Sequence, residues 1–92
     1  MEPITLYIDG PLDALHLNDL QENVNSLEIK DGQFVVLDCT GMTYICSSGL
    51  RIFLAMHKEI TEKNGKLIIK GLQPLVKNVF DMTGFSQIFN FE

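Results

Sequence analysis

The first third of the chain changes from a strand-like to a helix-like pattern of apolar residues. Residues 4–8 alternate apolar and polar side chains, which predicts a strand with one face in the core. Residues 9–11 (Asp-Gly-Pro) break it. Residues 18–27 then carry apolar side chains at helical spacing, and Asn18 with Gln21 resembles a capping box. We therefore expect a strand followed by a helix.

The centre of the chain predicts a buried strand, a turn and a long helix. Residues 34–37 (Phe-Val-Val-Leu) form a continuous apolar run, typical of an interior strand covered on both faces, so Val36 is expected to be buried. Thr40-Gly41 marks a turn, and Ser47-Ser48-Gly49 stands where a helix N-cap is expected. The helix should run over residues 48–63.

This central helix is expected to end at Asn64-Gly65, a pair suited to a left-handed C-terminal cap. The residues expected to face inward are Ile52, Phe53, Met56 and Ile60. Leu50 and Leu54 are expected on a flank near Ser47 that either is exposed and binds a partner or is covered by a second neighbouring helix.

The last third repeats the order of strand, helix and strand. Residues 66–70 form a short apolar strand, Pro74 suits the first turn of a third helix, and Gly84 ends that helix. Residues 87–91 form a last strand. The helix residues expected to face inward are Leu75, Val76, Val79 and Phe80. Alternating strands and helices predict one α/β domain over residues 1–92, with a mixed, mostly parallel sheet and helices chiefly on one side.

Composition narrows the classes of function. The net charge of −5 and the scattered Lys and Arg residues argue against nucleic-acid binding. No apolar run approaches the roughly 20 residues that span a bilayer, and no signal peptide is visible, so we expect a cytoplasmic protein. Cys39 and Cys46 lack the spacing of a redox or zinc motif and are expected to be buried or to line a turn. His16 and His57 are expected at the surface or at its boundary with the core. We expect no metal, cofactor or catalytic residue.

Ser47 is the candidate for chemistry because it precedes a helix. Free N–H groups and the aligned peptide dipoles make a helix N-terminus attractive to a phosphate, here through the N–H groups of Gly49 and Leu50. Arg51 follows four residues later, within reach of an anion. The alternative is that Ser47 is an ordinary N-cap, which stabilises a helix by about 1 kcal/mol.

With these elements in place, the chain resembles the STAS domain, the module shared by sulphate transporters and bacterial anti-sigma factor antagonists. The resemblance covers residues 4–91. The motifs that carry it are Gly10-Pro11-Leu12-Asp13, Val35-Val36-Leu37-Asp38, Cys46-Ser47-Ser48-Gly49-Leu50 and Val79-Phe80-Asp81-Met82-Thr83-Gly84-Phe85. Four such motifs in this order and spacing are fairly specific.

The resemblance implies a partner-switching module rather than an enzyme. In the antagonists, the serine after the motif's aspartate is phosphorylated by an anti-sigma factor that is also a serine kinase. That serine is Ser47 here, with Ser48 as the fallback. The unmodified domain would bind this kinase and so regulate a sigma factor. The partner-binding residues it implies are Asp13, Asp38, Cys46, Ser48, Gly49, Leu50, Arg51 and Leu54.

Three departures from the family pattern keep a second function open. Cys46 replaces the aspartate before the serine, which removes a charge beside the acceptor. The usual N-terminal strand and C-terminal helix are absent, so residues 4–8 are expected at a sheet edge, which favours a homodimer. The alternative function is that of a STAS accessory subunit, without phosphorylation, of a transporter or larger signalling complex.

Two further classes fit the sequence less well. A serine hydrolase would place its nucleophile at a similar strand-turn-helix junction, but residues 45–49 are not G-x-S-x-G. A phosphorelay receiver would use Asp38 as its acceptor, yet only Asp9 is available at the end of the first strand for magnesium. The other interpretation of Asp38 is a carboxylate that caps a turn.

Overall fold

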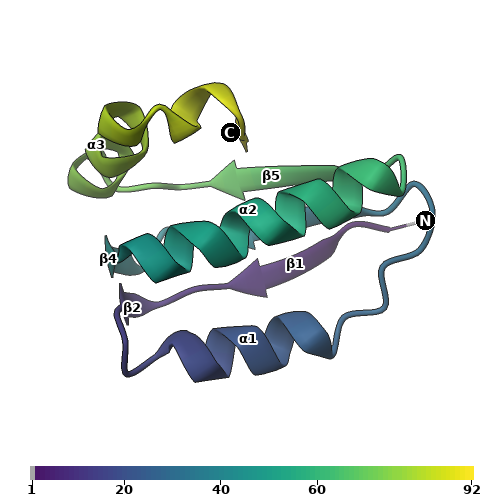
Figure 1. The fold of residues 1–92 in the computed structure, drawn as a ribbon, viewed down its shortest axis with the longest axis horizontal. Helices are drawn as coiled ribbons and strands as arrows, with labels where there is room; N and C mark the ends of the chain where they lie inside the picture. Colours follow the sequence, from purple (N-terminus) through teal and green to yellow (C-terminus); the bar gives the residue numbers. More distant parts are fainter. Residues whose placement is uncertain (1) are drawn as a thin grey trace.

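A computed structural model describes residues 2–92 of the chain (Figure 1). In chain order its elements are β1 (Ile4–Tyr7), β2 (Gly10–Leu12), α1 (Leu17–Asn25), β3 (Phe34–Asp38), β4 (Met42–Ile45), α2 (Ser47–Glu62), β5 (Lys66–Lys70), α3 (Pro74–Thr83), the short 3₁₀ helix η1 (Phe85–Gln87) and β6 (Asn90–Phe91). The predicted alternation of strands and helices is confirmed.

The main sheet has four strands in the order β1-β3-β5-β6, and each neighbouring pair is parallel. Figure 1 shows α1 and α2 side by side across the sheet, with α3 beside β5 and the C-terminus. The predicted parallel α/β fold is therefore confirmed. As expected, β1 lies at one edge of this sheet, and self-association along it stays a prediction.

Only one face of β3 is covered. Val35 and Leu37 are fully buried, whereas Val36 is only half-buried and Phe34 is 45% exposed. The prediction that β3 is buried on both faces, with Val36 inside, is wrong. The side chains of a strand alternate between its two faces, and the helices pack against the face of Val35 and Leu37. The apolar run thus leaves a partly apolar face open.

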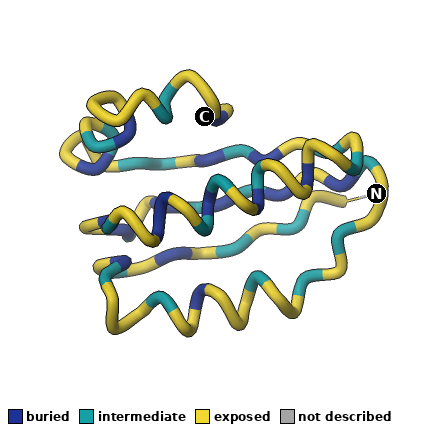
Figure 2. The backbone as a smooth tube through the Cα atoms, in the orientation of Figure 1, coloured by how far each residue is buried: buried dark blue, intermediate teal, exposed yellow. Residues whose placement is uncertain are grey.

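The helices bury their apolar stripes against that covered face, as the alternation of buried and exposed residues along α2 in Figure 2 shows. Phe53, Met56 and Ile60 are buried as predicted, and Ile52 is half-buried. In α3, Val76 and Phe80 are buried and Val79 is half-buried, but Leu75 is 80% exposed, contrary to expectation. Leu75 directly follows Pro74 in the first turn of α3, where the chain has just left the sheet.

Helix ends follow local sequence more closely than helix starts do. Asn64 has φ 63°, and Gly65 N–H donates to the Ile60 carbonyl at 2.9 Å, which closes α2 in a Schellman motif. Gly84, at φ 80°, ends α3 as predicted. The capping box predicted at Asn18 is wrong, because α1 starts one residue earlier, with His16 as its N-cap and no side-chain cap hydrogen bond.

Two short strands were not anticipated. β2 and β4 pair in parallel and form a separate two-stranded sheet at the end where β1 and β3 finish. Residues 9–11, expected to be a break, therefore include the start of a strand. The last strand is shorter than predicted, because η1 takes up residues 85–87. The pairing of β2 with β4 brings the loop before α1 next to the start of α2 (Figure 1).

Candidate functional site

The start of α2 carries the serine pair. Cys46 is the N-cap, with extended backbone angles (φ −92°, ψ 169°), and its side chain makes no cap hydrogen bond. Ser47 is therefore the first residue inside the helix, and the interpretation of Ser47 as an N-cap is wrong. The N–H group of Cys46 donates to the Leu12 carbonyl at 3.1 Å, because β4 carries the chain alongside β2 up to this point.

Both serines are exposed, and within residues 2–92 neither hydroxyl forms a hydrogen bond. The first helical hydrogen bond runs from Leu50 N–H to the Cys46 carbonyl at 3.1 Å. Leu50 N–H is thus not free to hold an anion, contrary to expectation. The orphan donors of this helix start are instead the N–H groups of Ser47, Ser48 and Gly49.

Gly49 is where α2 sits closest to the layer beneath it. Gly49 is buried, and a β-carbon placed there would lie 3.0 Å from both the Leu12 and the Ile45 side chains. Leu12 and Ile45 are each 3% exposed and belong to the core. Close packing of α2 on β2 and β4 therefore leaves little room for a side chain at position 49.

The apolar flank expected beside Ser47 is different in the structure. Leu50 is 4% exposed and packs in the core, so of the two alternatives for this flank the exposed, partner-binding one is wrong for Leu50. Leu54 is half-buried and also packs against the core. The exposed apolar side chain near the serines is Tyr44, which is 51% exposed on β4. The run Met42-Thr43-Tyr44-Ile45 has the composition of a strand, and that signal could have revealed Tyr44.

Asp13 lies next to this helix start because it follows Leu12, which contacts both Cys46 and Gly49. The Asp13 carboxylate accepts hydrogen bonds from His16 Nδ1 at 2.6 Å and from Leu15 N–H at 3.1 Å. The His16 contact is the main reason that the pKa of Asp13 is lowered. Asp13 is therefore a negative charge close to the serines.

We call the residues Asp13, Tyr44, Ser47, Ser48 and Arg51 the serine surface. Asp13 is partly buried and the other four are exposed. They come from the loop after β2, from β4 and from the first turn and a half of α2. The structure thus brings together residues that lie more than thirty positions apart in the sequence.

Asp38 has a local role in the turn after β3. Its Oδ1 accepts hydrogen bonds from Thr40 Oγ1 at 2.7 Å and from Thr40 N–H at 3.1 Å, and the hydroxyl contact contributes most to the lowered pKa of Asp38. This is the geometry of a carboxylate that caps a turn, the alternative to a receiver-type acceptor. Asp38 lies at the same end of the sheet as the serine surface, but its carboxylate is engaged by Thr40.

The cysteines and histidines occupy the kinds of position expected of them. Cys39 is buried, and burial raises the pKa of its thiol to about 12, while Cys46 is half-buried. Both thiols are free. His16 is exposed and paired with Asp13, and His57 is half-buried with its ring edge-on to Phe89.

The residues that the structure describes hold neither a metal-binding cluster nor a membrane-spanning helix. Among residues 2–92 there is no group of three or more His, Cys, Asp or Glu side chains that could hold a metal ion. Over the same residues, no helix is long and apolar enough to cross a membrane.

The fold and the site together define a class: a small α/β domain with a parallel sheet and a central helix that starts at an exposed serine pair. The chain belongs to the STAS domain family, whose model matches residues 2–92. It is 26% identical over 89 residues to an anti-sigma-B factor antagonist of Listeria monocytogenes, covering 97% of this chain and 78% of the relative.

Two further relatives carry related names. A Bordetella bronchiseptica protein, BtrV, named as a candidate anti-sigma factor antagonist, is 32% identical over 82 residues, which cover 89% of this chain and 71% of BtrV. An anti-sigma F factor antagonist of Paenibacillus polymyxa is 26% identical over 83 residues, covering 88% of this chain and 70% of the relative. All three names describe an antagonist of an anti-sigma factor.

Proposed function

We propose that this chain is an anti-sigma factor antagonist that works by partner switching. In its unmodified form it binds an anti-sigma factor with serine kinase activity through the serine surface. Phosphorylation of Ser47, with Ser48 as the fallback, then releases the partner and changes the activity of a sigma factor. The names of three relatives support this role, since each describes an antagonist of an anti-sigma factor.

The observation that carries the proposal is the state of Ser47. Its side chain is exposed and its hydroxyl is unengaged among residues 2–92, so a kinase can approach it without unfolding the helix. A phosphate on Ser47 would lie beside the orphan N–H groups of Ser47, Ser48 and Gly49, at the positive end of the helix dipole. Phosphorylation should therefore leave the fold intact.

The charges around Ser47 support release of the partner after phosphorylation. Asp13 is held ionised by its hydrogen bonds, so this end of the molecule already carries a negative charge. A phosphoserine adds about −1.5 to −2 charges at neutral pH. The partner would have to desolvate this dianion beside the exposed ring of Tyr44, which costs binding energy unless the partner supplies a positive group.

The residues proposed for partner binding differ in how they would act. Ser48 and Arg51 are exposed and available for direct contact, together with Asp13 and the half-buried Cys46. Gly49, Leu50 and Leu54 act through packing, because Gly49 and Leu50 are buried and Leu54 is half-buried against the core. Asp38 acts through the turn that it caps. The proposed surface is therefore more polar than the sequence predicted.

Cys46 favours a second candidate, a STAS accessory subunit without phosphorylation. A half-buried thiol occupies the N-cap where the antagonist motif has an aspartate. The chain thus lacks a carboxylate at the place where a cognate kinase would meet one. In this role the same surface would bind a transporter or a larger signalling complex constitutively.

Intact-mass measurement after incubation with candidate anti-sigma kinases and ATP separates the two functions. We expect a gain of one phosphate, lost in Ser47→Ala and retained in the matched variant Ser48→Ala. If Ser47→Ala is still phosphorylated and Ser48→Ala is not, the acceptor is Ser48. Binding to such a partner without any mass gain would favour the accessory subunit.

A phosphomimetic tests the switch itself. Ser47→Asp should weaken partner binding at least about tenfold, or about 1.4 kcal/mol, because it places a permanent negative charge on the serine surface. Its melting temperature should stay close to that of the unmodified chain, since an acidic side chain is tolerated in the first turn of a helix. Titration calorimetry and thermal unfolding measure the two effects. Equal affinity of Ser47→Asp and the unmodified chain would refute the switch.

A further inference from the structure

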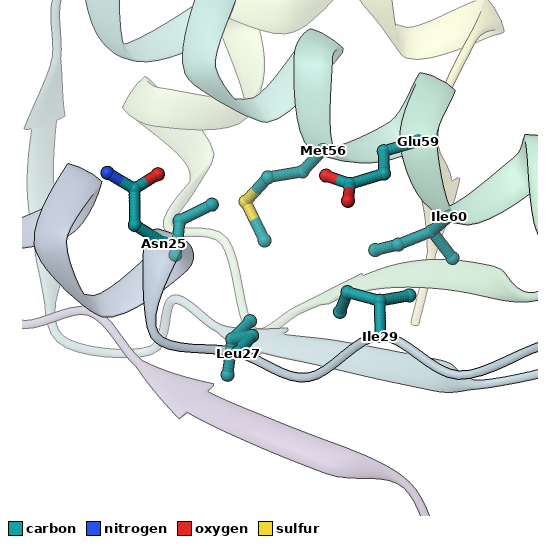
Figure 3. A pocket seen from close by; sticks show the side chains of 7 residues that line it. Asn25, Leu27, Ile29, Met56, Glu59 and Ile60 are labelled. Carbon is teal, nitrogen blue, oxygen red and sulfur yellow. The ribbon is translucent and has the colours of Figure 1, made fainter.

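A cavity of about 170 Å³ lies between α1 and α2, and Figure 3 shows it from close by. Its lining residues on α2 lie in the C-terminal half of that helix, whereas the serines stand at its start. The cavity exists because α1 ends at Asn25 and the chain then crosses back toward β3 in an extended form. Its lining residues are Val24, Asn25, Leu27, Ile29, Met56, Glu59 and Ile60. None of them belongs to the residues assigned to partner binding.

The inner wall of the cavity is apolar. Met56 is 3% exposed and Ile60 is 1% exposed, so both form part of the core. Leu27 and Ile29 are half-buried and close the opposite side from the segment between α1 and β3. In Figure 3 the Met56 side chain points between Asn25 and Leu27, toward the middle of the hollow. A flexible thioether of this kind adapts to aromatic and aliphatic groups.

The mouth of the cavity is polar and carries a negative group. The Glu59 carboxylate borders the cavity, and its contact with Lys63 Nζ is long, at 3.5 Å, with both side chains about half exposed. Lys63 Nζ also donates to the Ile29 carbonyl at 3.3 Å. Asn25 Oδ1 accepts from Gln21 Nε2 at 3.0 Å, which leaves the Asn25 amide N–H groups for a ligand.

The hollow continues along the two helices. A second, smaller hollow of about 110 Å³ shares Val24, Asn25, Met56 and Glu59 with the first. It reaches Ile52 and Ala55 on α2. Glu59 therefore lies where the two hollows meet, and a ligand that fills the first still has space for a short substituent.

We propose that this cavity binds a small organic cation, a primary ammonium on a single-ring apolar body. The ring lies among Met56, Leu27 and Ile29, and the ammonium group binds the Glu59 carboxylate in place of the long contact with Lys63. The size is suitable, since an apolar cavity of about 150 Å³ holds a benzene molecule. Glu59 is the charged residue of the lining, so an ammonium is favoured over a neutral or anionic head group.

Benzylamine, which is protonated at neutral pH, is the test ligand. In ¹H–¹⁵N and methyl NMR titrations of the full chain we expect saturable shifts at Val24, Met56 and Ile60. Benzyl alcohol and benzoate have the same ring and serve as neutral and anionic controls. Benzylamine should bind at least about tenfold more tightly than either. Equal binding of all three probes, shifts at other residues, or no saturation would overturn the proposal.

The variant Glu59→Gln tests how much the negative charge of Glu59 contributes to binding. We expect this variant to bind benzylamine about tenfold more weakly and to change the affinity for benzyl alcohol by less than about twofold. Unchanged alcohol binding also shows that the variant is folded. Glu62→Gln, which removes an exposed carboxylate from the same helix outside the cavity, should leave both affinities unchanged. An equal loss of benzylamine binding in both variants would mean that Glu59 does not hold the ammonium.

Discussion

Adjacent valines on β3 offer a sharp test of which face of the sheet is covered. Val35 is fully buried and lies between Ile4 of β1 and Leu67 of β5, whereas its neighbour Val36 is half-buried on the open face. We compare Val35→Asp with Val36→Asp. The two variants have the same composition and charge, so a difference between them reports only the face of the sheet.

The burial of the two valines sets the loss of folding free energy expected for each variant. Val35→Asp loses the burial of a valine side chain, about 1.5–3 kcal/mol, and places a carboxylate among apolar side chains, which costs several kcal/mol more. That sum reaches the lower end of the roughly 5–15 kcal/mol that stabilises a domain. Asp at position 36 keeps its carboxylate in water, so its cost should be about 1 kcal/mol, the span of strand propensities.

Urea denaturation followed by circular dichroism, with NMR spectra as a check of folding, measures both variants. Val35→Asp should be unfolded in buffer, and Val36→Asp should be folded with a slightly lower midpoint. A folded Val35→Asp, or a Val36→Asp that is unfolded, would refute the assignment of the open face. The apolar run by itself predicts that both substitutions unfold the protein.

Three further predictions concern the helix start and the thiols. Gly49→Ala should lower the free energy of unfolding, measured in urea, by about 1 kcal/mol, because its methyl group would lie 3.0 Å from two buried side chains. Alanine is normally favoured over glycine in helices, so a gain in stability would contradict this packing. Iodoacetamide should modify Cys46 first and spare buried Cys39 until the protein unfolds, and equal rates in mass spectra would contradict its burial. Because the pKa of Cys39 rises from 9.0 to about 12 on folding, the unfolded state loses this proton first, so stability should fall as the pH increases from about 9 to 12.

Local sequence was sufficient for the order of the helices, for the strands of the main sheet and for the helix ends. Helical spacing identified three helices, and one alternating segment and short apolar runs identified the strands of the main sheet, since these signals depend only on neighbours in the chain. Asn64 and Gly84 were identified as helix ends because each adopts a positive φ that most residues avoid. The place of Ser47 at the start of the central helix follows from the same local signals.

Contacts between segments that are distant in the sequence determined the remaining features of the site and of burial. No local sequence pattern predicts those contacts. The pairing of β2 with β4 depends on two three- or four-residue segments meeting in space, and it brings Asp13 next to the start of α2. A helical projection placed Leu50 on a flank that could be exposed, yet Leu50 is 4% exposed and belongs to the core. Val36 appeared buried, yet burial depends on which face the helices cover. Periodicity thus determines which residues share a face, but only the packed structure determines what covers that face.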